Sequence, residues 1–412
     1  MKDFFTLISS SDFLSLLPQF SPLEQEALPL AEARGRVLSE DVVCREALPP
    51  FSRSTMDGFA VRAADTFGSS ESETALLTVI GEISMGVSGQ AFPLRPGQAV
   101  RIWTGGELPP KADAVVMVEY TQCLDDETVA VYRPVAPGEN VIRAGEDYAL
   151  GAPVLARGSI LRPQDLGVLS GLGVTAVPVY RRPRVAILST GDELVPPDQV
   201  PPPGKIRDLN STTLAALVEE AGGIPIACGI CGDELDPICA VCTEALAQAD
   251  VLLLSGGSSV GRRDFTLEVF KALPRTEVLV HGVSIRPGKP TILAAQGNKA
   301  LFGLPGHVAS AMVVFTLFVR PLLRQYAGLG ATMGLQTIRA ITAQQIPSVI
   351  GREDYVRVLL TPQDDGGPPL ATPVYGKSGL LSPLVRADGL LPISRNSEGL
   401  DRGIETPVLL FP

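Results

Sequence analysis

Between residues 181 and 330 the chain repeats one pattern: a short apolar run, a glycine-rich turn and a segment with helical periodicity. The apolar runs include "RVAILST", "ADVLLLS" and "KALFGL". Strands that alternate with helices in this way predict a parallel sheet with helices on both faces. The carboxyl ends of such strands lie at one edge of the sheet, and ligands bind there. The pattern therefore predicts a central α/β domain whose ligand site lies among these turns.

The rest of the chain has a different texture. Residues 1–48 are predicted to be mainly helical, with Ser21 capping a helix that begins at Pro22. Short alternating apolar runs between Gly and Pro turns predict two small β domains. Residues 145–180 return to turns and short apolar pieces that could pack against the N-terminal helices. We therefore predict a multidomain α/β plus β protein with four domains: a discontinuous N-terminal domain of 1–48 with 145–180, a small β domain at 49–144, the α/β domain at 181–330 and a β-barrel-like domain at 331–412.

The composition limits the classes of partner. Hydrophobic residues make up 45% of the 412 residues, which is enough to bury several cores. A net charge of −11 and a pI of about 4.9 argue against a surface for nucleic acid or anionic membranes, but not against small anions. The first residues lack the basic region and apolar core of a signal peptide, and the apolar stretch 308–319 is shorter than the roughly 20 residues of a membrane span. We therefore expect a cytoplasmic protein.

Four of the six cysteines form two CxxC pairs, Cys228/Cys231 and Cys239/Cys242. This spacing resembles that of zinc ligands. However, the first pair ends a predicted strand, and the second pair shares an apolar helix face with Leu246. Buried reduced thiols are the favoured interpretation, and a zinc site is the alternative.

The turns at the predicted sheet edge combine groups that bind anions with acidic groups. Glycine-rich turns expose N–H groups that bind phosphate oxygens, and the turn "RPGKP" at 286–290 adds positive charge. Carboxylates beside a phosphate site usually bind a divalent cation, typically Mg²⁺, although an Asp at a helix start can also be a simple cap. The acids at this edge are Asp192, Glu193, Asp233 and Asp264. A phosphate–Mg²⁺ site explains them best.

Four further features are candidates for function. Outside the α/β domain, three turns carry polar residues: "MDG" contains Asp57, "WTGG" contains Thr104 and "GEDY" contains Asp147. Each could be ordinary turn chemistry. Inside the α/β domain, His307 follows the turn Leu304-Pro305-Gly306 and precedes a helix. We expect this corner to form one wall of the anion site.

Taken together, these segments resemble the molybdopterin molybdenumtransferase family, the MoeA type to which the gephyrin E domain is related. The resemblance covers almost the whole chain, with the motifs in order, and is therefore specific. It rests on the segments "STMDGFAVRAADT", "RIWTGGELPPKADAVVMVE", "IRAGEDYALGAPVLARGSIL", "VAILSTGDEL", "IRDLNSTTL", "SGGSSVGRRDFT", "IRPGKP" and "GLPGHVASA".

The resemblance implies an elongated subunit of four domains that forms a homodimer through its N-terminal domain. The active site would lie between the α/β domain of one subunit and the first β domain of the other. The implied reaction is the Mg²⁺-dependent insertion of molybdate into adenylylated molybdopterin, with release of AMP. The implied partners are a molybdopterin adenylyltransferase and apo-molybdoenzymes.

Carried over residue by residue, the resemblance implies three sets, of which the first is part of the second. Glu193, Asp233 and Asp264 would hold Mg²⁺. The catalytic set contains these three acids and also Asp57, Thr104 and Asp147. The residues that would bind the pterin, its phosphate or the metal oxide are Thr190, Gly191, Asp192, Gly256, Gly257, Ser258, Gly261, Arg286, Lys289, Pro305 and His307.

The chain departs from the family pattern at three positions. His307-Val308 stands where the family usually has Asn-Pro, Arg286 replaces a Lys, and Ser258 replaces an aliphatic residue. An Arg offers a planar fork to oxyanions where a Lys offers a point charge. The departures keep alternatives to a molybdate insertase open: a tungstate-preferring insertase, a weakened molybdopterin-binding or scaffold relative, and a different phosphate-handling enzyme on the same fold.

Overall fold

The computed structural model describes residues 6–256, 265–364 and 366–411. The chain forms two compact units. Unit 1 consists of residues 1–26 and 179–412, and unit 2 consists of residues 27–178. The four-domain division stays a prediction.

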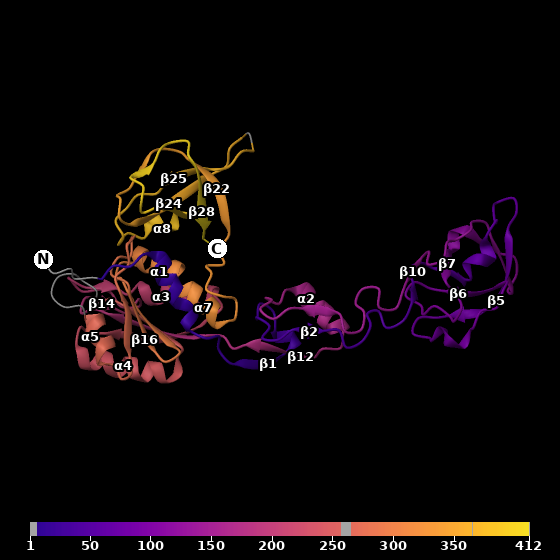
Figure 1. The fold of residues 1–412 in the computed structure, drawn as a ribbon, viewed down its shortest axis with the longest axis horizontal. Coiled ribbons are helices and arrows are strands. Elements are labelled where there is room, and N and C mark those ends of the chain that lie inside the picture. Colours follow the sequence, from indigo (N-terminus) through magenta and orange to yellow (C-terminus); the bar gives the residue numbers. More distant parts are fainter. Residues whose placement is uncertain (1–5, 257–264, 365, 412) are drawn as a thin grey trace. The chain divides into compact units, whose positions relative to one another are not determined.

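A six-stranded sheet, in the order β16-β13-β17-β21-β20-β18, forms the centre of the α/β part of unit 1. Its edge strand β16 is labelled in Figure 1. The first four strands are parallel, and β20 and β18 are antiparallel to their neighbours. The predicted α/β domain is confirmed, but its sheet is mixed. Only Gly297 and Asn298 separate β20 from β21, and so short a connection can join only antiparallel strands. The strands are β13 (Arg184–Thr190), β16 (Ile224–Cys231), β17 (Val251–Ser255), β18 (Glu277–His281), β20 (Ile292–Gln296) and β21 (Lys299–Leu304).

Both faces of this sheet are buried. Val185 and Ile187 of β13 pack into one apolar cluster, and the alternating residues Ala186 and Leu188 pack into another. The first cluster includes residues of α1 (Ser10–Leu16), α3 (Asn210–Glu220) and the helix that starts at Val308. The second includes residues of α4 (Leu235–Gln248) and α5 (Phe265–Ala272). The continuous apolar runs in the sequence therefore reflect strands that are covered on both sides.

One long helix crosses the first cluster. It runs through α6 (Val308–Val314), a π-helical turn at η6 (Phe315–Val319) and α7 (Arg320–Tyr326). At 19 residues this helix is longer than the apolar stretch in the sequence suggested, and by length and composition it could cross a membrane. However, 78% of its apolar window is buried inside the protein. Such burial is typical of a core helix; for example, Phe318 stacks on Phe13 of α1 with ring centroids 4.1 Å apart.

The predicted helix after Ser21 is wrong. Its residues form strand β1 (Gln25–Pro29), which pairs with β12 (Ala176–Tyr180). The N–H of Ser21 donates to Asn298 at 2.8 Å. A helix there would contain Pro29, which lacks an N–H and clashes with the preceding turn. In residues 6–48 the α-helical part is α1, and short 3₁₀ turns occur at η1 (Leu17–Gln19) and η2 (Leu30–Glu32).

Unit 2 contains a second six-stranded sheet, in the order β7-β4-β6-β5-β9-β8. Elsewhere in unit 2, β2 (Val42–Val43) pairs with β11 (Pro153–Leu155), and β3 (Arg53–Ser54) pairs with β10 (Val141–Ile142). The first pairing places residues of 145–180 against the N-terminal segment. The sheet strands are β4 (Gly58–Val61), β5 (Ala75–Ile83), β6 (Gln98–Ile102), β7 (Ala114–Met117), β8 (Thr121–Cys123) and β9 (Thr128–Val131), and the helical segments are η3 (Ala63–Thr66), η4 (Gly89–Ala91), η5 (Val118–Tyr120) and α2 (Pro163–Gly171).

The C-terminal part of unit 1 is a closed barrel. Its strands follow the order β24-β25-β22-β28-β26, and β24 also pairs with β26, which closes the ring. This confirms the barrel-like prediction. The strands are β22 (Thr337–Thr342), β24 (Glu353–Thr361), β25 (Leu370–Pro373), β26 (Gly389–Ile393) and β28 (Glu405–Leu410), and a short helix, α8 (Ser382–Val385), precedes β26. Short pairs are formed by β14 (Leu194–Val195) with β15 (Ile206–Arg207) and by β23 (Ile346–Pro347) with β27 (Gly399–Leu400).

The two CxxC pairs pack into the second apolar cluster and are free thiols. Burial and the three neighbouring thiols raise the pKa of Cys242 to about 12, so it is protonated at neutral pH. Within the described residues, no three His, Cys, Asp or Glu side chains form a group that could hold a metal ion. The packing therefore favours structural thiols over zinc ligands.

Candidate functional site

Three of the predicted turns meet at one edge of the unit 1 sheet. In the parallel register Ser189 pairs with Ser255, and Ser255 pairs with Leu304. The strands β13, β17 and β21 therefore end side by side, as the sequence predicted. Thr190, Gly256 and Pro305 are the next residues after these paired positions.

Gly256 allows the closest approach between these turns. Its φ of +112° is in the region that favours glycine, and a Cβ there would lie 2.2 Å from the carbonyl oxygen of Thr190. The buried Asn210 joins the neighbouring turns, because its Nδ2 donates to Ser255 Oγ and to the Gly306 carbonyl, both at 2.9 Å. Sequence reasoning did not assign a role to Asn210. The predicted residues Gly257, Ser258, Gly261 and Asp264 lie outside the described residues.

Three acids gather where β13 and β16 end. The N–H of Asp233 donates to Asp192 Oδ1 at 3.2 Å. Burial, together with the negative charges of Asp192 and Glu193, raises the pKa of Asp233. One carboxylate oxygen of Asp233, Oδ1, is buried and has no hydrogen-bond partner among the described residues.

This acidic edge fits a divalent cation in part. A buried carboxylate oxygen without a partner, close to two further carboxylates, is a suitable ligand for Mg²⁺. The three acids alone do not form a complete site, since the described residues contain no group of three that could hold a metal ion. Further ligands would have to come from the substrate, from water or from the segment that contains Asp264.

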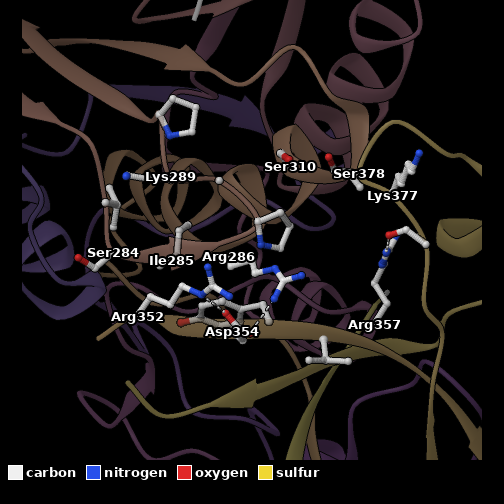
Figure 2. Close-up of a pocket in the computed structure, with 18 of the residues that line it drawn as sticks. Ser284, Ile285, Arg286, Lys289, Ser310, Arg352, Asp354, Arg357, Lys377 and Ser378 are labelled. Carbon is white, nitrogen blue, oxygen red and sulfur yellow. Dashed lines mark hydrogen bonds and ion pairs between the residues drawn. The ribbon is translucent and has the colours of Figure 1, made fainter. Parts of the chain in front are cut away.

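A cavity of about 660 Å³ lies in unit 1, between the α/β sheet and the barrel. Figure 2 labels the basic residues that line it, which come from both parts. The described basic residues in its lining are Arg286, Lys289, Arg352, Arg357 and Lys377. Asp354, which is only 3% exposed, is the one acidic residue among the described residues that line it. Five cations around one acid favour the binding of an anion.

Sequence reasoning found Arg286 and Lys289 but missed the basic residues of the barrel. Strand β19 (Ile285–Arg286) pairs with β24, so that Arg286 lies opposite Asp354. The Asp354 carboxylate holds Arg286 at 3.6 Å and Arg352 at 3.1 Å. The segment "GREDYVRV" contains Arg352, Asp354 and Arg357, but its spacing gave no signal, because its partner strand lies far away in the sequence.

The "RPGKP" turn requires a glycine at position 288, because Gly288 is buried and has a φ of +119°. A Cβ at this position would lie 2.6 Å from Val314 of α6 and 2.8 Å from Ile285.

We expect Gly288→Ala to destabilise the protein by about 1–3 kcal/mol, because it adds both backbone strain and a steric overlap with the core helix. It should also weaken anion binding, since Lys289 is the next residue. Urea unfolding would measure the first effect. Gly403→Ala is the matched control, because Gly403 has a φ of +83° but nothing within 4 Å of the added Cβ. Equal losses in the two variants would contradict the packing argument.

His307 lies beside the cavity rather than in its described lining. Its Nδ1 is 3.0 Å from Ser378 Oγ, and Ser378 does line the cavity. Ala309 and Ser310, the residues that follow Val308 at the start of α6, also belong to the lining. The start of α6 therefore connects the Gly306 turn at the sheet edge with the cavity.

In unit 2, two of the predicted turns come together. Asp57 Oδ1 accepts hydrogen bonds from the Thr104 N–H at 2.8 Å and from the Thr104 hydroxyl at 2.7 Å. These bonds lower the pKa of Asp57, so its exposed side chain is a carboxylate at neutral pH. Asp147 is exposed in a different turn, where its N–H donates to the Leu48 carbonyl at 3.1 Å.

Three family models match successive parts of the chain. The MoeA N-terminal region (domain I and II) matches residues 8–173, a probable molybdopterin binding domain matches 186–325, and the MoeA C-terminal region (domain IV) matches 339–411.

Individual proteins are similar over nearly the full length. A molybdopterin molybdenumtransferase from Bacillus subtilis is 35% identical over 94% of this chain and 90% of its own length, and molybdopterin molybdenumtransferase 2 from Mycobacterium tuberculosis is 35% identical over 92% and 94%. Two crystal structures of the molybdopterin biosynthesis MoeA protein from Pyrococcus horikoshii are 34% identical, with TM-scores of 0.86 and 0.82; the matches cover 99% and 98% of this chain and 100% of each structure. The chain therefore belongs to the MoeA family of molybdopterin molybdenumtransferases, which act in molybdenum cofactor biosynthesis.

Proposed function

We propose that the protein inserts molybdate into adenylylated molybdopterin and releases AMP, in a reaction that depends on Mg²⁺. The observation that carries this proposal is that the start of α6 joins the glycine turns of the sheet edge, through Gly306, to the basic cavity, through Ala309 and Ser310. The acidic edge with its glycine turns suits a phosphate and a cation, and the basic cavity suits an oxyanion. Transfer of the metal from its oxide to the pterin needs both the phosphate site and the oxyanion site.

In this proposal the basic cavity binds the metal oxide. Arg286 and Lys289 would contact the oxyanion, as the resemblance implied, and Arg352, Arg357 and Lys377 would join them from the barrel. A tetrahedral dianion loses its hydration when it enters such a cavity, and several fixed donors replace that hydration.

The acidic edge would organise the pterin phosphate. Thr190, Gly191 and Gly256 would offer backbone groups, with Gly257, Ser258 and Gly261 of the loop that follows. Mg²⁺, when bound, would neutralise the phosphate charge and favour AMP as the leaving group. Glu193 and Asp233 would hold it, together with Asp264, and Asp192 would accept the Asp233 N–H. Metal transfer then needs positioning and charge neutralisation, and it does not need a protein nucleophile.

We further propose a cytoplasmic homodimer in which Asp57, Thr104 and Asp147 act in the site of the partner copy. It would receive its substrate from a molybdopterin adenylyltransferase and pass its product to apo-molybdoenzymes. The support for these points is the family membership together with the exposed carboxylate of Asp57.

Mixing two inactive variants tests the shared site. Asp57→Asn and Glu193→Gln should each be inactive alone, but random exchange of subunits should restore about a quarter of the wild-type activity, because half of the dimers are mixed and one of their two sites is intact. AMP release after co-refolding measures this. No recovery, with mixed dimers present in native mass spectra, would refute the shared site.

The function itself is tested by incubating the purified protein with adenylylated molybdopterin, Mg²⁺ and molybdate and following AMP. We expect AMP release that requires both the oxyanion and Mg²⁺. Tight pterin binding without AMP release would refute the insertase and favour the molybdopterin-binding or scaffold alternative. Repeating the assay with tungstate decides the preference for the metal, and faster turnover with tungstate would replace molybdate in the proposal.

A further inference from the structure

One wall of the basic cavity is formed by residues 375–378, which we call the wall segment. Arg357 Nη2 donates to the Gly376 carbonyl at 2.7 Å, which ties the segment to the barrel. The Ala309 N–H donates to the Ser378 carbonyl at 3.2 Å, which ties it to α6. The wall segment is therefore held from both sides of the cavity, and Ser378 at its end is labelled in Figure 2.

His307 adds a side-chain contact at the same end of the segment. Its Nδ1 is 3.0 Å from Ser378 Oγ, and a Cβ on the adjacent Gly379 would lie 3.4 Å from His307 Cδ2. The backbone on both sides of this contact is already fixed by the Ala309–Ser378 hydrogen bond and by packing of Val308 and Ala309 against Leu384. The histidine is therefore not needed to hold the wall segment in place.

The contact instead determines what the Ser378 hydroxyl can do. A serine hydroxyl has one proton to donate and two lone pairs, and Nδ1 of an imidazole either donates or accepts. If Nδ1 accepts, the Ser378 proton is used and the oxygen offers only lone pairs, which repel an anion. If Nδ1 donates, the Ser378 proton remains available for an oxyanion in the cavity.

We propose that His307 is a positioning residue for oxyanion binding: its Nδ1–H donates to Ser378 Oγ, so that the Ser378 hydroxyl donates to the bound oxyanion. The inference rests on the proposed function, because it takes a tetrahedral metal oxide as the occupant of the basic cavity. It gives the histidine at this corner a role through Ser378, without direct contact with the ligand.

Binding of molybdate to the full-length protein, measured by isothermal titration calorimetry, tests the role of the pair. Ser378→Ala and His307→Leu should each weaken binding about 10-fold, the double variant should be no weaker than either single one, and His307→Asn, which retains a donor, should stay within about 3-fold of the wild type.

The outcomes separate the two proposals. Wild-type affinity in His307→Leu, or equal losses in His307→Leu and His307→Asn, would refute the role of His307 and leave the proposed function intact. A wild-type protein that binds no molybdate would refute both. Thermal melting of each variant identifies any loss that is due to unfolding.

Nitrogen NMR of ¹⁵N-histidine-labelled protein tests the donor state directly. The chain has two histidines, so His281 serves as an internal reference. At saturating molybdate we expect the His307 Nδ1 signal at the position of a protonated nitrogen. A signal that stays at the position of an unprotonated nitrogen would contradict the proposal, since Nδ1 would then be an acceptor.

Discussion

Asp233→Asn is expected to lower turnover about 100-fold and, in the absence of Mg²⁺, to raise the melting temperature by roughly 2 °C. The two effects share a cause. Burial and the charges of Asp192 and Glu193 oppose ionisation of Asp233 and raise its pKa, so the carboxylate costs stability when no cation is bound. Asparagine removes the charge and its repulsion, and it also removes an anionic ligand for the cation.

AMP release and thermal melting measure the two effects. Asp236→Asn is the matched control, because Asp236 is an exposed acid three residues further along, in the first turn of α4. It should leave turnover nearly unchanged. A large loss of stability in Asp233→Asn would show that this carboxylate is structural, and normal turnover would remove it from the proposed site.

The raised pKa also predicts the direction of a pH effect. The folded protein holds the Asp233 proton more tightly than the unfolded chain does. This proton therefore adds to the free energy of unfolding at low pH, and the contribution is lost as the pH rises through the pKa of Asp233 in the folded protein. Mg²⁺ needs the ionised carboxylate. The Mg²⁺ concentration for half-maximal turnover should therefore rise as the pH falls, starting at a higher pH than an ordinary Asp would give, and Asp233→Asn should lose this part of the profile.

Local patterns predicted much of unit 1. The runs in β13, β17 and β21 identified the strands, and the parallel register then placed their turns at one edge. The same reasoning failed after Ser21, where a good N-cap and a helical spacing were outweighed by Pro29 and by pairing with a strand about 150 residues away in the sequence. Turn chemistry and hydrophobic period are local, whereas strand pairing is not.

The residues of the candidate site likewise fall into a group that local patterns predicted and a group that depends on distant strand pairing. Asp192, Asp233 and Gly256 follow strands of the sheet, so the sequence placed them together. Arg357 and Lys377 belong to the barrel, whose strand β24 pairs with β19 beside the "RPGKP" turn. No spacing in the sequence encodes that contact. The resemblance marked Asp57 and Thr104 as functional residues, but nothing in the sequence predicted that they pair in unit 2.

Lys289→Ala is expected to raise the KM for molybdate about 30-fold, with a much smaller change in kcat. Molybdate is a dianion, and Lys289 is one of five cations in a lining whose one described acid, Asp354, already holds Arg286 and Arg352. Removing one cation costs a Coulomb term that solvent screens in part, because the Lys289 side chain is exposed at the edge of the cavity. That interaction is present in the ground state, so its loss appears mainly in KM.

Steady-state AMP release at varied molybdate concentrations measures the KM. Added salt should narrow the difference in KM between Lys289→Ala and the wild type, since salt screens the attraction between Lys289 and molybdate. Lys289→Arg keeps the charge and should stay within about 5-fold of the wild-type KM. Lys271→Ala, at the exposed end of α5, is the control for net charge, because Lys271 is not in the described lining of the cavity. If Lys271→Ala raised the KM as much as Lys289→Ala does, the effect would come from overall charge, and the basic cavity would not be the oxyanion site.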